Sequence, residues 1–341
     1  MARRASVEAL SRYSRDLLQS AGADETSAEA ATWAVLHASL HGVDSHGVRL
    51  LPWYANGLGA GLIKGAPNIT VSYPRRAVAT VNADGGLGHL AMYRAMDEAC
   101  SIARDCGIGM AAVIHSTHFG AAGAYTLAAA EAGFIGMATS NSGAFVVPHG
   151  GSLPIHGTSP ISLAAPNPGG DHFLLDMATS SIPWNKVLRY RTEGLALPEG
   201  AAVDATGRFV TDPRDAVALA PAGGADFGFK GAGLAGLAEI LGGVLTGMRL
   251  SVEQDGTQIA DRELGHFVMA IDPTLLMPLQ AFGVRLQDYL DAFKREPGIM
   301  AAGGPEWAHR REREVHGVPL PDGLYAELRE AAQTAGIEFG L

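Results

Sequence analysis

Short apolar runs alternate with stretches of helical periodicity in the first half of this chain, and the alternation leaves few fold classes open. The predicted strands lie at about 69–73, 77–82, 108–114 and 134–140. Helical patterns separate the last three of them, one ending near residue 105 and one over 121–131. Strands that alternate with helices in this way are typical of α/β proteins. We therefore predict the α/β fold class.

Helical patterns also occupy both ends of the chain. The terminal helices are predicted at about 5–20, 26–41, 278–294, 305–315 and 322–335. Between the two ends, the glycine- and proline-rich stretch over 141–230 and the residues after it predict short strands near 144–148, 161–165 and 173–177, a helix over 231–248 and a strand over 265–271. We expect an N-terminal helical segment (1–75) that packs with the C-terminus, a central domain (76–272) and a C-terminal helical segment (273–341).

The charge and apolar content of the chain exclude several classes of partner. The net charge of −10 argues against nucleic acid, because phosphates are bound by basic surfaces. No apolar run reaches the roughly 18 residues of a membrane span, and the N-terminus lacks the apolar core of a secretory signal. Cys100 and Cys106 fall in one predicted helix, at a spacing that suits neither a disulfide nor a metal site. We expect a cytoplasmic protein that acts on a small molecule.

Two histidines stand at the ends of predicted elements, among small residues. His46 lies in the sequence Asp-Ser-His-Gly where a helical pattern stops, and His118 lies in His-Ser-Thr-His-Phe-Gly between a strand and a helix. Imidazole can give and take protons near neutral pH. Ser45 could orient the ring of His46, and Gly120 would let a ligand approach the backbone. The pattern indicates an enzyme that moves protons, and a hydroxyl-oxidising dehydrogenase needs such a group.

Two glycine patterns match the dinucleotide-binding fingerprint formally. Residues 86–91 follow a strand but have no clear strand-end acid about 20 residues on, and residues 231–236 have no strand before them. Helix packing or capping explains both patterns better.

Two further alternatives concern the same histidines. A zinc-dependent hydrolase could be built on His37, His41, Asp44 and His46, which lie within ten residues. A serine hydrolase lacks its G-x-S-x-G elbow anywhere in the chain. We therefore expect that these residues do not bind a metal ion.

Five segments occur in an order that closely resembles the malate/L-lactate dehydrogenase family, which is unrelated to the Rossmann-type lactate and malate dehydrogenases. They are HGVDSHGVRLLPWYANGL, HSTHFGAAGAY, PIHGTSPISLAAP, DMATSSIPWNK and FKGAGLAGLAEILGGVLTG. The resemblance runs over about residues 5–338 and includes ureidoglycolate and sulfolactate dehydrogenases, diketogulonate reductase and cyclic-imine carboxylate reductases. It implies a non-Rossmann NAD(P)-binding central domain bracketed by helical terminal segments. It also implies NAD, or NADP, as cofactor, and a homodimer with the active site at the subunit interface.

The resemblance also assigns roles to individual residues. Ser45, His46 and His118 match catalytic positions, and either histidine could exchange the proton. Thr158 matches a substrate-side position. The positions that match cofactor contacts are His118, Ser142, Asp176, Met177, Ala178, Lys230, Gly303, Gly304 and Pro305.

Two departures from the family pattern bear on the substrate. Many relatives have an arginine four residues after the histidine of the Ser-His-Gly motif, where it can bind a carboxylate bidentately. Here that position is Leu50, and Arg49 precedes it. Imine-reducing relatives have an aspartate where this chain has Asn185 and Lys186. We predict an NAD(P)-dependent oxidoreductase that interconverts a 2-hydroxy acid and a 2-oxo acid, with imine reduction and metal-dependent hydrolysis as alternatives.

Overall fold

A seven-stranded mixed sheet forms the centre of the molecule. The structure, a computed structural model, describes residues 3–254 and 263–341. The sheet has the order β2-β3-β4-β11-β5-β6-β7. Its strands are β2 (Thr70–Arg75), β3 (Val78–Asn82), β4 (Ile108–Ser116), β5 (Ile135–Ser140), β6 (Ile161–Ala165), β7 (Phe173–Met177) and β11 (Leu264–Ile271). The predicted α/β class is therefore confirmed.

Only one pair of neighbouring strands in this sheet is parallel. α4 (Gly88–Cys106) carries the chain from β3 across to the parallel β4. β11 then pairs antiparallel with both β4 and β5. A Rossmann fold has a mostly parallel sheet, so the expectation of a non-Rossmann fold is also confirmed.

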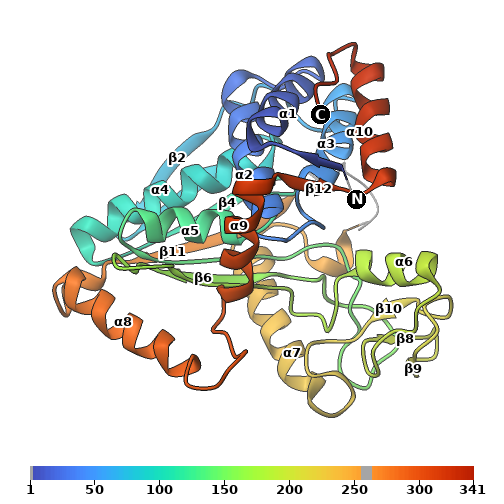
Figure 1. The fold of residues 1–341 in the computed structure, drawn as a ribbon. Helices are drawn as coiled ribbons and strands as arrows, with labels where there is room; N and C mark the ends of the chain where they lie inside the picture. Colours follow the sequence, from blue (N-terminus) through green and yellow to red (C-terminus); the bar gives the residue numbers. More distant parts are fainter. Residues whose placement is uncertain (1–2, 255–262) are drawn as a thin grey trace.

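Helices cover both faces of the sheet (Figure 1). α4 and α5 (Gly123–Glu131) bury small and apolar side chains against one face, where alanines such as Ala95 and Ala111 are fully buried. α7 (Gly224–Glu239), continued by a π-helical turn (Ile240–Val244), packs against β5 and β11 on the other face. α8 (Leu279–Phe293) lies beside the loop between β6 and β7, where Gln287 accepts a hydrogen bond from Asn167 at 2.8 Å.

The two ends of the chain share one apolar core. β1 (Arg3–Ala5) pairs antiparallel with β12 (Val318–Leu320). The helices that enclose this core are α1 (Val7–Ser20), α2 (Glu25–Leu40), α3 (Leu51–Gly59) and α10 (Asp322–Ala335). α9 (Gly304–His316) begins beside β7 and leads from the sheet to this core. The termini consequently lie close together (Figure 1).

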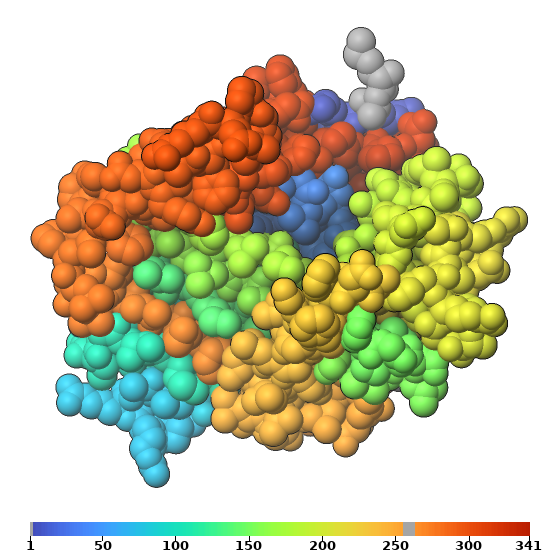
Figure 2. Space-filling model, turned by 90° about the horizontal axis from the view of Figure 1, so that it is seen from below, coloured from blue at the N-terminus to red at the C-terminus, as the bar shows by residue number. Residues whose placement is uncertain are grey.

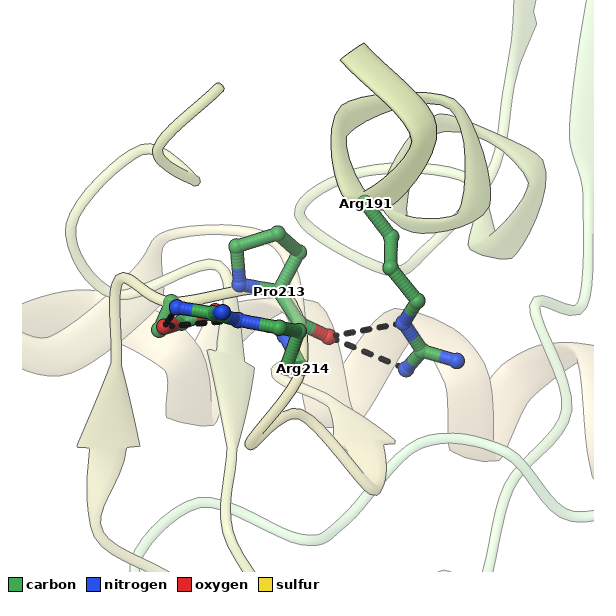
Figure 3. Close-up of polar contacts among 4 residues, drawn as sticks. Arg191, Pro213 and Arg214 are labelled. Atoms are coloured by element: carbon green, nitrogen blue, oxygen red, sulfur yellow. Dashed lines mark hydrogen bonds and ion pairs between the residues drawn. The ribbon is translucent and has the colours of Figure 1, made fainter. Parts of the chain in front are cut away.

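A small lobe follows β7, and its elements were missed by the sequence analysis. It contains α6 (Trp184–Glu193) and the short strands β8 (Ala202–Val203), β9 (Phe209–Val210) and β10 (Ala218–Leu219). The guanidinium of Arg191 on α6 donates two hydrogen bonds, of 3.2 and 2.9 Å, to the carbonyl of Pro213 (Figure 3). These two hydrogen bonds connect α6 to the loop between β9 and β10.

Two predicted elements differ in the structure. The strand predicted near 144–148 is wrong, because Val146 makes only isolated bridges to His156 and Leu219 within a buried loop. The helix predicted over 231–248 begins earlier, at Gly224. Within the described ranges, no helix combines the length and hydropathy that crossing a membrane requires.

Candidate active site

The rings of His46 and His118 lie face to face. Their centroids are 5.7 Å apart and their planes differ by 17°. His46 comes from the turn after α2, and His118 comes from the loop between β4 and α5. The structure therefore brings together the two histidines singled out in the sequence.

A hydroxyl and an ion pair hold the turn that carries His46. The Ser45 hydroxyl lies 2.9 Å from Nδ1 of His46. Asp44 is bound by the buried Arg313 of α9 at 2.5 and 3.1 Å, and the same guanidinium donates to the carbonyl of Ser39. Burial lowers the pKa of His46 below its ordinary value, so its ring is neutral at pH 7.

Two donors converge on one nitrogen of His118. The Tyr54 hydroxyl lies 2.7 Å from Nδ1, and the backbone N–H of Gly120 points at the same atom at 3.3 Å. Because a backbone N–H can only donate, Nδ1 acts as an acceptor and the proton of the neutral ring is on Nε2. The pKa of His118 is lowered well below its usual value, first by burial and then by repulsion from His46 and from the two deeper histidines, His89 and His266.

Glycines allow this loop to approach its neighbours closely. A Cβ on Gly88, the first residue of α4, would lie 2.3 Å from the carbonyl oxygen of Thr117. Gly120 has φ of +77°, a conformation that favours glycine. The glycine pattern over 86–91 thus serves packing next to His118, in agreement with the sequence interpretation.

The two deeper histidines, His89 and His266, are fully buried. His266 bonds to the hydroxyls of Ser140 at 2.7 Å and Ser116 at 2.8 Å. His89 has no hydrogen-bond partner on either nitrogen among the described residues. Burial lowers the pKa of each to about 3.

A pocket of about 210 Å³ opens beside the two stacked histidines. It collects most of the predicted site residues, namely Ser45, His46, His118, Ser142, Thr158, Asp176, Met177 and Ala178. They come from the α2 turn, the loops after β4 and β5, the loop before β6, and β7. The pocket is smaller than the usual ligand site, so it suits a small acid and one ring rather than a whole dinucleotide.

Other predicted residues lie outside this pocket. Arg49 is exposed in the 3₁₀ turn Val48–Leu50. Lys230 on α7 holds its ammonium 5.2 Å from the ring centroid of Phe227. Gly303 lies against the backbone of Leu174 in β7.

A larger cleft, of about 830 Å³, lies near the other end of β7. Its lining includes His172, Lys294, Gly304, Trp307 and Arg311. β7 therefore runs from this cleft to the histidine pocket. Figure 2 shows a hollowed face in which the N-terminal part of the chain lies deepest, between the C-terminal helices and the residues around 180–240.

Asp176 is half-buried and lines the histidine pocket near the end of β7. Its carboxylate accepts the backbone N–H of Gly123 at 2.8 Å. Burial raises its pKa to about 6, against the opposing effect of this hydrogen bond. An acceptor in this setting can bind ligand hydroxyls above that pH.

The polar atoms of the pocket wall fit a ligand that carries both donors and acceptors. Oγ of Ser142 and Oδ1 of Asn141 are buried without a partner among the residues that the structure describes. Buried polar atoms are normally hydrogen-bonded. The wall is therefore suited to the polar groups of a nicotinamide or a hydroxy acid.

The residues of the alternative zinc site are engaged elsewhere. Asp44 pairs with Arg313, His46 faces His118, and the ring of His37 packs 4.2 Å from that of His41. In residues 3–254 and 263–341, no group of three or more potential ligands is close enough to hold a metal ion.

Tyr54 and Asn141 are site residues that the sequence analysis missed. Tyr54 lies within the segment that carries the Ser-His-Gly motif, and Asn141 directly precedes Ser142. Their positions next to predicted site residues were the available signal, but only the tertiary contacts distinguish them from packing residues.

Comparison with known sequences gives a consistent family relationship. The profile of the malate/L-lactate dehydrogenase family matches residues 5–329. The malate dehydrogenase of Pyrococcus abyssi is 36% identical over 334 residues, covering 94% of this chain and 92% of the relative. The NADP(+)-dependent (2R)-3-sulfolactate dehydrogenase of Chromohalobacter salexigens is 32% identical, with 92% and 94% covered. The NAD(+)-dependent ureidoglycolate dehydrogenase of Escherichia coli is 30% identical, with 95% and 94% covered.

Solved structures agree over nearly the whole chain. The malate dehydrogenase of Entamoeba histolytica superimposes with a TM-score of 0.93 at 26% identity, covering 100% of both chains. The Δ1-piperideine-2-carboxylate reductase of Pseudomonas syringae gives a TM-score of 0.87 at 28% identity, covering 97% of this chain and 100% of that chain.

Proposed function

Because this chain belongs to the malate/L-lactate dehydrogenase family, we propose that it interconverts a 2-hydroxy acid and a 2-oxo acid with a nicotinamide dinucleotide. It is an oxidoreductase that acts on CH–OH groups, like its dehydrogenase relatives. The observation that carries the proposal is the stacked pair His46 and His118 in one small pocket.

The proton chemistry follows from the state of the two rings. Each ring has its Nδ1 engaged, in His46 by Ser45 and in His118 by Tyr54. Burial keeps both rings neutral at pH 7. Nε2 of His118 then carries the ring proton and can donate to an oxygen, whereas Nε2 of His46 can accept a proton when Nδ1–H of His46 donates to Ser45. We therefore assign uptake of the substrate hydroxyl proton during oxidation to Nε2 of His46, while Nε2–H of His118 holds the substrate oxygen or the nicotinamide end. A nicotinamide held in this pocket would supply the hydride chemistry.

The cofactor is NAD, with NADP as the alternative. Ser142, Met177 and Ala178 line the pocket on the side of β5 and β7, and we assign them to the nicotinamide end. Asp176 accepts ribose hydroxyls. Gly303, Gly304 and Pro305 would hold the part of the dinucleotide that extends along β7 toward the larger cleft. Lys230 would bind the cofactor phosphates.

Thr158 and Arg49 are our candidates for substrate recognition. Thr158 lines the histidine pocket. Arg49 follows His46 by three residues and is exposed, so it is available to bind a carboxylate. Its position three rather than four residues after the histidine distinguishes this chain from many relatives.

We also propose a cytoplasmic homodimer that completes the active site at its interface. The outer face of α7 and its π-helical turn exposes Leu234, Leu237, Ile240 and Val244 at helical spacing. An exposed apolar stripe of this kind marks an interaction surface. Sedimentation velocity should show a dimer, and Ile240→Asp should shift it toward monomer. Leu153→Asp, at an exposed loop residue, should leave it unchanged.

The test of the proposed activity is turnover. Purified protein is mixed with NADH or NADPH, and absorbance loss is followed with pyruvate, oxaloacetate, 2-oxoglutarate and a cyclic imine. We expect a 2-oxo acid to be reduced, and His46→Ala and His118→Ala each to lower kcat about 100-fold or more. The variant that lacks the proton-exchanging group should also lose the pH dependence of kcat, whereas the other should keep that pH dependence and also raise KM.

A matched control for these variants is His115→Asn. His115 precedes His118 by three residues, but it does not line the histidine pocket and its Nδ1 lies 3.4 Å from the carboxylate of Glu263. Its loss should therefore leave kcat near the wild-type value. Near-normal turnover in both His46→Ala and His118→Ala would refute the proposal. Turnover of the cyclic imine alone would reassign the substrate.

A further inference from the structure

Asn141 follows β5 and is only 1% exposed, yet one of the two polar atoms of its amide has no partner among the described residues. Its Nδ2 donates to the carbonyl of Arg249 at 2.8 Å and to the carboxylate of Glu239 at 3.3 Å. Its Oδ1 is buried without a hydrogen bond to any described residue. Leaving such an acceptor unpaired costs about 1–3 kcal/mol, so a ligand that donates to it gains affinity.

The orientation of this amide is fixed by its surroundings. The carboxylate of Glu239 is itself held by the backbone N–H of Ser251 at 2.8 Å and by the hydroxyl of Ser251 at 2.5 Å. A carboxylate and a carbonyl can only accept, so the Nδ2 of Asn141 must face them. Oδ1 is therefore held as an acceptor, and the amide cannot flip to offer a donor.

The neighbouring Ser142 supplies the complementary capacity. Its hydroxyl is also buried without a partner in the described part of the chain, and both residues line the histidine pocket. A hydroxyl can donate, whereas Oδ1 can only accept. Together they match a primary carboxamide, which offers one carbonyl oxygen and N–H donors. A 2-hydroxy acid offers only carboxylate acceptors besides the hydroxyl that faces a histidine.

We propose that Asn141 recognises the nicotinamide carboxamide, with Oδ1 accepting its N–H while the Ser142 hydroxyl donates to its carbonyl. The inference rests on the proposed function, because it assumes a nicotinamide dinucleotide in this pocket. It assigns Asn141 a cofactor-binding role, with Glu239 and Ser251 as the residues that position it.

The test uses a cofactor analogue that lacks the relevant donor. Reduced 3-acetylpyridine adenine dinucleotide replaces the carboxamide NH₂ by a methyl group and keeps the carbonyl. Calorimetric titration of the wild-type protein should give an affinity for NADH about 10-fold or more above that for the analogue. If NADPH binds more tightly than NADH, NADPH and its own acetylpyridine analogue are used.

Asn141→Ala should remove this discrimination. The variant should bind NADH about 10-fold more weakly and bind the analogue as the wild type does. Asn82→Ala is the matched control, because Asn82 is also partly buried at the end of a strand, where its Oδ1 accepts the N–H of Asp84 at 2.9 Å. The Asn82→Ala variant should bind both NADH and the analogue as tightly as the wild-type protein does.

The outcomes separate the two proposals. Equal wild-type affinity for NADH and the analogue would overturn the role of Asn141, while turnover with a 2-oxo acid would still support the proposed function. No binding of either NADH or NADPH would overturn the proposed function itself. If Asn141→Ala fails to fold, the wild-type comparison decides, since it needs no substitution.

Discussion

The hydroxyl of Tyr54 lies 2.7 Å from Nδ1 of His118. Tyr54 is on α3, within the core shared by the two termini, and is fully buried. The hydrogen bond therefore fixes the ring of a candidate catalytic residue on the sheet domain through a side chain from the helical segment.

Tyr54→Phe should lower kcat about 10-fold, because the ring of His118 loses its partner at Nδ1. A hydrogen bond donated to the neutral ring lowers the pKa of His118, so its removal should also raise the pKa seen in the pH profile of kcat. Steady-state kinetics from pH 5 to pH 9 would measure both effects. Tyr13→Phe removes an equally buried hydroxyl that bonds the carbonyl of Leu328, and it should leave kcat and the profile unchanged.

Arg313→Met should destabilise the turn that carries His46. It removes the donors to Asp44 and to the carbonyl of Ser39, with an expected loss of about 2–3 kcal/mol in unfolding free energy and a fall in kcat. Urea denaturation and kinetics would measure the two. Arg311 lies on the same helix as Arg313 and forms an exposed ion pair with Asp171. Arg311→Met breaks this pair, and a loss below about 1 kcal/mol in unfolding free energy is expected. Equal losses in the two variants would contradict the proposed role of Arg313.

His89→Leu should stabilise the protein. Both ring nitrogens of His89 lack a partner among the described residues, and removing such buried polar atoms should add about 1–3 kcal/mol to the unfolding free energy at pH 7. The folded pKa of about 3 lies below the unfolded value of 6.5. Stability is therefore lost in the wild type as pH falls from 6.5 toward 3, and the advantage of the variant should grow by about 1.4 kcal/mol per pH unit.

The control for this substitution is His266→Leu. His266 is equally buried but is hydrogen-bonded to Ser116 and Ser140. It should lose stability at pH 7, because those hydrogen bonds disappear. Thermal denaturation of both variants at pH 5, 6 and 7 would distinguish them, and stabilisation by both would show that the partners of His266 contribute nothing.

The affinity for NADH should depend on the ionisation of Asp176. Its pKa is raised by burial to about 6, so the carboxylate that accepts ribose hydroxyls is present above that pH and is lost below it. The wild-type dissociation constant should rise several-fold between pH 7.5 and pH 5, as each lost charge-assisted hydrogen bond costs about 1.5–3 kcal/mol. In Asp176→Asn the affinity should be weak and independent of pH.

Asp97→Asn is the comparison for this experiment. Burial raises the pKa of Asp97 as well, but this residue lies on α4, near a different cavity. Its substitution should leave the pH dependence of NADH binding as it is in the wild type. A wild-type affinity that does not change with pH would exclude ionised Asp176 as a ribose acceptor.

Local patterns in the sequence were sufficient for the α/β class and for most elements around the histidines. β3, α4 and β4 follow each other with clear periodicity, so each could be predicted from neighbouring residues alone. The short strands β8, β9 and β10 were missed because two-residue strands have no periodicity to detect. Their pairing depends on contacts within the small lobe.

The sequence by itself determined the kind of chemistry, through His46 and His118 in small-residue surroundings and through the family motifs. Only the tertiary structure decided that these rings stack and that Tyr54 supports one of them. It also decided that Asn141, which lines the same pocket, keeps an acceptor unpaired by any residue that the structure describes. The physical reason is that residue type and local spacing act within a few positions of the chain. Ring contacts and buried hydrogen bonds instead depend on how α3, β4 and α7, which are distant in sequence, pack around one sheet.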